Sequence, residues 1–198
     1  MPAIRAAVKA FGREHPDLHH DDLTEIVERL WAEPVHDRRV ACAELLDRYG
    51  VLLAPPDMAL LERLLREART WAIGDRLSAS VAGAVVDRHP DAASALDRWA
   101  DDDDFWIRRA SMLTLLVPLR RGAGDFDRFG RYADGMLDET EFFIRKAIGW
   151  VLRDTGRRRP QLVLDWLLPR AGRASGVTLR EALKPLSEEQ RRQILSSR

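Results

Sequence analysis

The sequence predicts an all-α protein built as an α-solenoid of helix pairs. The first observation is a string that recurs at residues 35–43 (VHDRRVACA), 103–111 (DDFWIRRAS) and 140–148 (TEFFIRKAI). Each copy has a polar start, then an apolar residue and a basic pair. The second observation is the spacing, because the equivalent residues Arg38, Arg108, Arg145 and Arg180 are 70, 37 and 35 positions apart. A repeat in this range is typical of solenoids made of helix pairs.

The third observation is helical periodicity without strand-like alternation of apolar and polar residues. The 70 positions between Arg38 and Arg108 equal two repeats of 35, so a further copy of the repeat is expected near Ile73. That segment keeps the helical pattern but lacks the basic pair. Proline residues mark the boundaries, because proline is tolerated at a helix start and ends a helix elsewhere. The predicted helices cover residues 3–14, 21–33, 36–49, 57–69, 71–88 and 91–100.

In the second half, glycine and proline separate further helices in the same way. Pro118 lies within SMLTLLVPLRR and is expected to kink or end its helix. Gly149 lies inside a helical pattern, where it costs about 1 kcal/mol relative to alanine, so a close neighbouring helix is expected there. The predicted helices cover residues 104–121, 125–137, 140–155, 160–171, 178–185 and 187–196.

Length and composition favour one domain over residues 1–198, with enough chain to bury a core. No apolar run reaches membrane-spanning length, and the N-terminus lacks a signal-peptide pattern. Cys42 falls in an apolar helical pattern, so a buried, inert thiol and a reducing, cytoplasmic setting are expected. The net charge is zero, but 29 of the 32 basic residues are Arg, which binds phosphate bidentately. A neutral total can therefore hide a basic face.

Two strings carry the candidate chemistry. Four aspartates in a row follow Trp99 and precede Trp106. One of them, Asp103 or Asp104, is expected to cap the next helix, which leaves carboxylates for another role. In the second string, Arg145 and its basic neighbour lie near a helix start, where a cation opposes the helix dipole. Their position therefore favours an external anion. No histidine or cysteine spacing indicates a metal, and no glycine-rich phosphate loop indicates a cofactor, so neither is expected.

The strings WADDDDFWIRRASMLTLL and EFFIRKAIGWVLRD closely resemble the DNA alkylation repair family of the AlkD type, over a range from about Pro2 to the C-terminus. The resemblance implies a HEAT-like α-solenoid with right-handed superhelical curvature and a concave groove. It implies that Trp99 and Asp103 face the lesion-bearing nucleotide and that Arg145 is the arginine of the catalytic cleft. A second lesion-facing Trp of the family cannot be placed on this sequence.

The resemblance further implies a DNA glycosylase that excises cationic purines, 3-methyladenine and 7-methylguanine, from double-stranded DNA. The partner would be DNA containing alkylated bases, with no membrane, and the protein would be a cytoplasmic, nucleoid-associated monomer. A carboxylate would stabilise the oxocarbenium-like sugar and orient water, and aromatic faces attract a cationic base. Phosphate contacts are expected at Arg38, Arg108, Arg109, Lys146, Arg180 and Lys184.

The sequence is also compatible with two other functions. One is a non-catalytic HEAT-like protein that binds branched or distorted DNA, which would show a steep salt dependence without base release. The other is a protein-binding scaffold, the general role of helical solenoids, which would show no DNA affinity at moderate salt.

Overall fold

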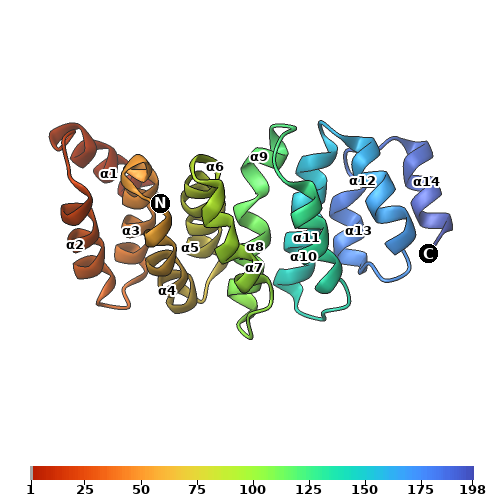
Figure 1. Cartoon of the computed structure of the whole chain (residues 1–198), viewed down its shortest axis with the longest axis horizontal. Helices are drawn as coiled ribbons and strands as arrows, with labels where there is room; N and C mark the ends of the chain where they lie inside the picture. The colour runs from red at the N-terminus through yellow and green to blue at the C-terminus, as the bar shows by residue number, and fades with distance from the viewer. Residues whose placement is uncertain (1) are drawn as a thin grey trace. The chain divides into compact units, whose positions relative to one another are not determined.

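The computed structural model describes residues 2–198, and every element in this part of the chain is helical. The chain divides into two compact units, residues 1–95 and 96–198, here called the N-terminal and C-terminal units. The single domain predicted over residues 1–198 stays a prediction. Within each unit, consecutive long helices lie side by side and run in opposite directions (Figure 1).

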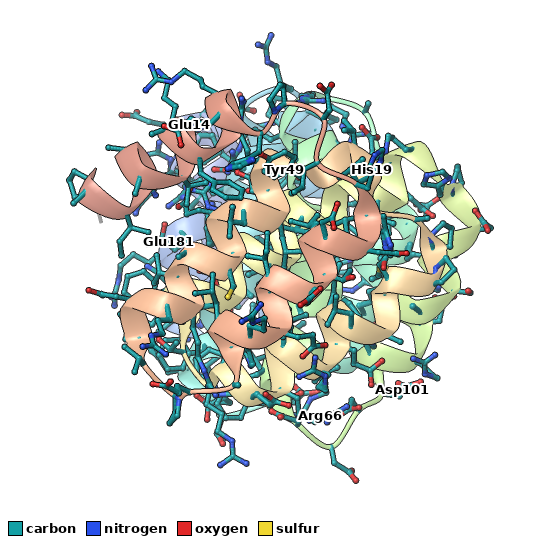
Figure 2. The ribbon with its side chains drawn as sticks, turned by 90° about the vertical axis from the view of Figure 1, so that its left-hand side faces the viewer. Glu14, His19, Tyr49, Arg66, Asp101 and Glu181 are labelled. Atoms are coloured by element: carbon teal, nitrogen blue, oxygen red, sulfur yellow. The ribbon has the colours of Figure 1, made fainter. Side chains whose placement is uncertain are left out.

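The N-terminal unit begins with three helices, of which α3 packs against both α1 and α2. The ring of Phe11 in α1 lies 6.4 Å from that of Tyr49 at the end of α3, and the Tyr49 hydroxyl donates to the His15 carbonyl at 2.7 Å. Figure 2 shows Tyr49 and His19 at one end of these helices and Arg66 of α4 at the opposite end. The bounds are α1 Pro2–Glu14, α2 His20–Trp31, α3 His36–Arg48 and α4 Met58–Ala68.

The helix predicted over residues 71–88 is one continuous helical run with an unpredicted π-helical segment. It consists of α5 (Trp71–Arg76), a π-helix (Leu77–Ala82) and α6 (Gly83–Arg88). The Ser78 hydroxyl donates to the Gly74 carbonyl at 2.6 Å, next to the place where the hydrogen-bond pattern changes. Short 3₁₀ turns at Gly50–Leu52, Pro55–Asp57 and Pro90–Ala93 join the helices of this unit.

The C-terminal unit repeats a two-helix pattern. Its second helices, α8, α11 and α13, form a contiguous layer in which α11 contacts both of the others. The helix interruption predicted from Pro118 is confirmed: α8 ends at Thr114, four positions before Pro118, and Pro118 itself lies within α9, which starts at Leu116. The bounds are α7 Ser94–Ala100, α8 Phe105–Thr114, α9 Leu116–Arg120, α10 Phe126–Gly135, α11 Phe142–Gly156, α12 Pro160–Leu167, α13 Gly176–Ala182 and α14 Glu188–Ser196.

Close packing between α11 and α13 explains Gly149. A Cβ atom at this position would come within 2.9 Å of the Glu181 Cβ atom and of the Thr178 carbonyl oxygen. The close neighbouring helix predicted from the sequence is therefore confirmed.

Cys42 is fully buried in α3, and burial raises the pKa of its thiol to about 12. The buried thiol expected from the sequence is confirmed. Over residues 2–198, none of the helices combines the length and apolar character that a membrane crossing requires.

Candidate active site

The aspartate run between α7 and α8 divides into two kinds of residue. The Asp104 side chain accepts a hydrogen bond from the Trp106 amide at 2.9 Å and caps α8, as predicted. The Asp102 carboxylate accepts from the Asp104 amide at 2.8 Å and stabilises the turn. Asp101 and Asp103 are exposed, and no residue of the described chain donates a hydrogen bond to either carboxylate. Local structure therefore accounts for two of the four carboxylates and leaves Asp101 and Asp103 open to solvent.

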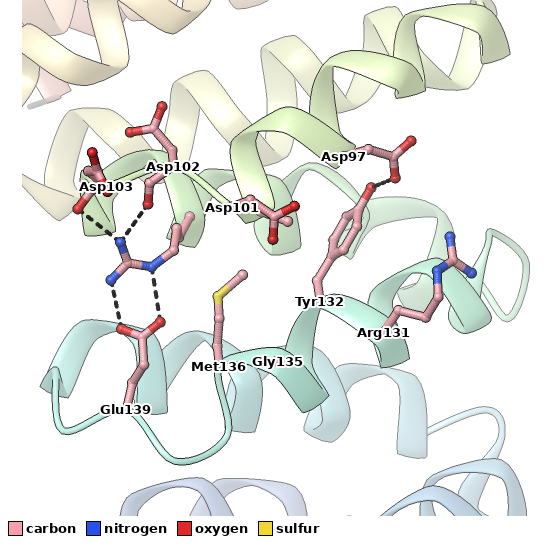
Figure 3. A pocket seen from close by; sticks show the side chains of 11 residues that line it. Asp97, Asp101, Asp102, Asp103, Arg131, Tyr132, Gly135, Met136 and Glu139 are labelled. Carbon is pink, nitrogen blue, oxygen red and sulfur yellow. Dashed lines mark hydrogen bonds and ion pairs between the residues drawn. The ribbon is translucent and has the colours of Figure 1, made fainter.

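Arg108 fixes the backbone that carries Asp103. Its Nε and Nη2 groups donate to the two carboxylate oxygens of Glu139 at 2.9 and 2.8 Å. Its Nη1 group donates to the carbonyl oxygens of Asp102 and Asp103 at 2.6 and 2.9 Å (Figure 3). The hydrogen bonds to Glu139 raise the pKa of Arg108. The turn before α8 is thus tied to the segment between α10 and α11.

This arrangement differs from the phosphate contact expected of Arg108. Four of the five N–H donors of its guanidinium are used inside the protein. A phosphate contact would have to break a bidentate ion pair, so Arg108 acts as a clamp for the turn.

The Arg145 side chain also bonds to a residue before its own helix, but more of its N–H donors are unused than in Arg108. Its Nε group donates to the Glu139 carbonyl at 2.6 Å, six positions earlier in the chain. The side chain is partly exposed, and no residue among 2–198 is found to accept from its Nη1 or Nη2 groups. Arg145 is therefore held in place through Nε and can offer the N–H donors of its two Nη groups to an anion.

Two other predicted site residues are buried. The Trp99 side chain has no exposed surface, so its ring is not open to a nucleotide in this structure. Arg109 is 4% exposed; its Nη1 group donates to the Phe143 carbonyl, and its guanidinium lies 5.8 Å from the centre of the Phe143 ring. Both placements differ from the expectation, because these side chains pack between elements instead of facing solvent.

The two predicted lysines surround one buried acid. Lys146 and Lys184 donate to the two carboxylate oxygens of Glu181 at 2.6 and 2.8 Å, and Arg153 also donates to it. These cations lower the pKa of Glu181 to about 2, with the bond from Lys146 the largest cause. The side chains of Lys146 and Lys184 remain 41% and 53% exposed. Because Arg153 also pairs with Asp154, the surplus positive charge at this surface comes from the two lysines.

The remaining two predicted phosphate contacts are exposed. Arg180 lies on α13, next to Glu181 in sequence. Arg38 lies in the N-terminal unit, where its Nη1 group pairs with Glu33 at 2.6 Å. Both partners of that pair are exposed, so the pair costs little to break.

A pocket of about 560 Å³ lies beside the Asp103 turn. The Tyr132 hydroxyl donates to Asp97 at 2.5 Å on one side of it (Figure 3). Five carboxylates and two guanidinium groups line the pocket, so it attracts a cation and disfavours a phosphate. The lining residues are Asp97, Ala100, Asp101, Asp102, Asp103, Arg108, Arg131, Tyr132, Gly135, Met136 and Glu139.

Two features of this region were not predicted from the sequence. Glu139 accepts hydrogen bonds from both Arg108 and Arg145: its carboxylate accepts from Arg108, and its backbone carbonyl accepts from Arg145. Aromatic residues occur at equivalent positions before the basic pairs (FW in one repeat, FF in the next), and their rings meet in space. In residues 2–198, no group of three or more histidine, cysteine, aspartate or glutamate residues is arranged to hold a metal ion.

Solved structures of similar fold place the chain in context. A predicted DNA alkylation repair enzyme from Enterococcus faecalis has a TM-score of 0.84 at 20% identity, with 94% of this chain and 86% of that chain covered. AlkD2 from Streptococcus mutans has a TM-score of 0.71 at 13% identity, with coverages of 94% and 90%. The protein smu.31 from Streptococcus mutans UA159 has a TM-score of 0.69 at 15% identity, with coverages of 94% and 98%. At these identities the likeness shows the fold.

A comparison with curated proteins finds no match. The family model for DNA alkylation repair enzymes, in contrast, matches residues 1–186, which is nearly the whole sequence. The repeat strings, the all-helical fold and this match lead to one conclusion: the chain belongs to the DNA alkylation repair enzyme family.

Proposed function

We propose that the protein is a DNA glycosylase that releases cationic alkylated purines, 3-methyladenine and 7-methylguanine, from double-stranded DNA. Family membership supports a role in DNA repair. The observation that carries the finer proposal is the state of Asp103. Its carboxylate is exposed and has no partner in residues 2–198, while its backbone is fixed by Arg108.

Such a carboxylate suits the chemistry of a cationic purine. The base already carries a positive charge, so the bond between C1′ and the ring nitrogen can break without protonation of the leaving group. The bonding electrons go to the base, which leaves neutral, and positive charge develops on the sugar. Asp103 would stabilise that charge and orient a water molecule, whose oxygen bonds to C1′ and whose proton passes to the carboxylate or to solvent. The products are the free base and an abasic site.

The surrounding charges support separate sites for the cationic base and for the phosphates. The acidic pocket beside Asp103 attracts a cationic base. Phosphates require other surfaces, and the partly or fully exposed cations on α11, on α13 and just after α13 offer them. We assign Arg145 to the backbone next to the lesion, and Lys146, Arg180 and Lys184 to flanking phosphates. Arg38 would be a further contact from the N-terminal unit. Trp99, Arg108 and Arg109 are left out because they are buried or committed to internal bonds.

Release of methylated bases tests the proposal. Wild-type protein is expected to release 7-methylguanine or 3-methyladenine from methylated duplex DNA faster than the spontaneous rate, measured by chromatography of the free bases. Asp103→Asn is expected to lose this activity while it keeps its helical circular dichroism. Full release by the variant would overturn the role of Asp103.

The second candidate is a non-catalytic protein that binds branched or distorted DNA. One observation favours it: Trp99, expected to face the lesion, is fully buried. This function predicts tight binding to a four-way junction, with a steep salt dependence and no base release from methylated DNA. The same two assays therefore separate the candidates. The monomeric state and the cytoplasmic, nucleoid-associated location stay predictions.

A further inference from the structure

Four aromatic side chains meet at the start of α8 and α11. They form the aromatic cluster, defined as Phe105, Trp106, Phe142 and Phe143. The ring centres of Phe105 and Trp106 are 4.7 Å apart, and those of Trp106 and Phe143 are 4.8 Å apart. The rings of Phe105 and Phe143 are nearly parallel, with an angle of 7° and a separation of 6.5 Å, and Phe142 lies edge-on to Phe143 at 5.4 Å.

The aromatic cluster is incompletely covered by the protein. Phe142 is 53% exposed, and the other three side chains are partly exposed. The core of the repeat does not depend on Phe142, because Ile144, Ala147 and Ile148 of the same helix are fully buried and fill it. Large rings left at the surface in mutual contact are typical of binding sites.

Cations next to the aromatic cluster indicate the chemistry of the partner. Arg145 follows Phe142 by three positions on α11, so the two side chains are neighbours on the helix surface. Arg145 has Nη donors to offer, and the Arg109 guanidinium lies under Phe143 at 5.8 Å. Aromatic faces next to the Arg145 guanidinium, whose Nη groups point to no acceptor in residues 2–198, match a nucleobase with its phosphate. Asp103 lies two residues before Phe105, so the aromatic cluster adjoins the proposed reaction site.

We infer that the aromatic cluster is a stacking surface for an unpaired nucleobase in distorted DNA, with Phe142 as its exposed ring. The inference rests on the proposed function, because it assumes that DNA is the partner. It adds a specificity-determining element that lies outside the acidic pocket, since none of the four residues lines it. A paired base offers only its edge, whereas an unpaired base can present a face to the rings.

The test compares binding to a matched duplex and to the same duplex with one bulged 2-aminopurine. Wild-type protein is expected to prefer the bulged DNA and to quench the 2-aminopurine fluorescence. Phe142→Ala is expected to weaken binding to bulged DNA at least about fivefold, the lower bound for loss of one base–aromatic stack. It should leave binding to the matched duplex within about twofold, while Phe142→Trp keeps the preference.

Matched variants separate stacking from other effects. Phe142→Leu keeps an apolar side chain without an aromatic face and should behave like Phe142→Ala. Leu195→Ala removes a side chain of similar exposure (52%) from α14 and should change nothing. Arg145→Ala should weaken binding to both DNAs alike, because a phosphate is present in each.

The outcomes also separate this inference from the proposed function. If Phe142→Ala leaves the preference for bulged DNA unchanged, or Phe142→Leu retains it, the aromatic cluster is not a stacking surface. This conclusion would hold even if the wild-type protein releases methylated bases. If wild type binds neither DNA and releases no base, the proposed function fails and takes the inference with it.

Discussion

Glu181→Gln should destabilise the protein in a way that depends on pH. The Glu181 side chain is 7% exposed and accepts bonds from Lys146, Lys184 and Arg153. Glutamine keeps the shape but removes the negative charge. Three cations would then face one another around a neutral amide.

The magnitude follows from the pKa of Glu181, which falls from an ordinary value of 4.5 to about 2. A difference of this size corresponds to about 3 kcal/mol at neutral pH. Because Lys146 and Lys184 are half-exposed, water screens part of the attraction, and we expect a loss of about 2 kcal/mol. A pKa that is lower in the folded state stabilises the protein above pH 4.5. This contribution is lost as the pH falls from 4.5 towards 2.

Urea unfolding followed by circular dichroism, at pH 7 and pH 3, measures the effect. The difference in unfolding free energy between wild type and Glu181→Gln should fall to less than half at pH 3. Glu188→Gln, at an exposed glutamate of α14, is the control and should change little at either pH. An equal loss at both pH values would refute the reasoning, because it would trace the destabilisation to shape instead of charge.

Three further predictions concern packing, reactivity and DNA contact. Gly149→Ala should lower the free energy of unfolding by about 1–3 kcal/mol, because the new Cβ atom would lie 2.9 Å from the Glu181 Cβ atom. Gly135→Ala has open space around it and should be neutral or stabilising. Equal effects of the two changes in urea unfolding would contradict this prediction. Cys42 should react with iodoacetamide only after unfolding, since burial raises its pKa to about 12, and rapid alkylation of the native protein would be inconsistent with the structure. Arg145→Ala should weaken DNA binding and reduce the slope of log Kd against log salt by about one, as measured by anisotropy. An unchanged slope would remove Arg145 from the backbone contacts.

The helices were predictable because proline and glycine mark their ends, and Pro118 broke its helix where expected. The π-helical segment Leu77–Ala82 was not predictable, because it depends on hydrogen bonds that a periodic pattern does not encode. Asp104 was correctly predicted as a possible cap from its position before an apolar helix.

The candidate site was less predictable because its side chains are placed by distant parts of the chain. Arg108 was expected to face phosphate, but its partner Glu139 lies 31 positions later. Arg109 contacts a carbonyl 34 positions away. Trp99 did give a signal, because it follows the buried Leu96 by three positions and so shares its helix face.

The central claim is that the exposed, unpartnered carboxylate of Asp103 promotes loss of a cationic base. Single-turnover release of 7-methylguanine from a defined duplex tests it most directly, with Asp101→Asn as the matched control from the same turn. We predict release by wild type above the spontaneous rate, a loss of at least about a hundredfold in Asp103→Asn, and a rate within a few-fold of wild type in Asp101→Asn. Equal rates for wild type and Asp103→Asn would contradict the claim.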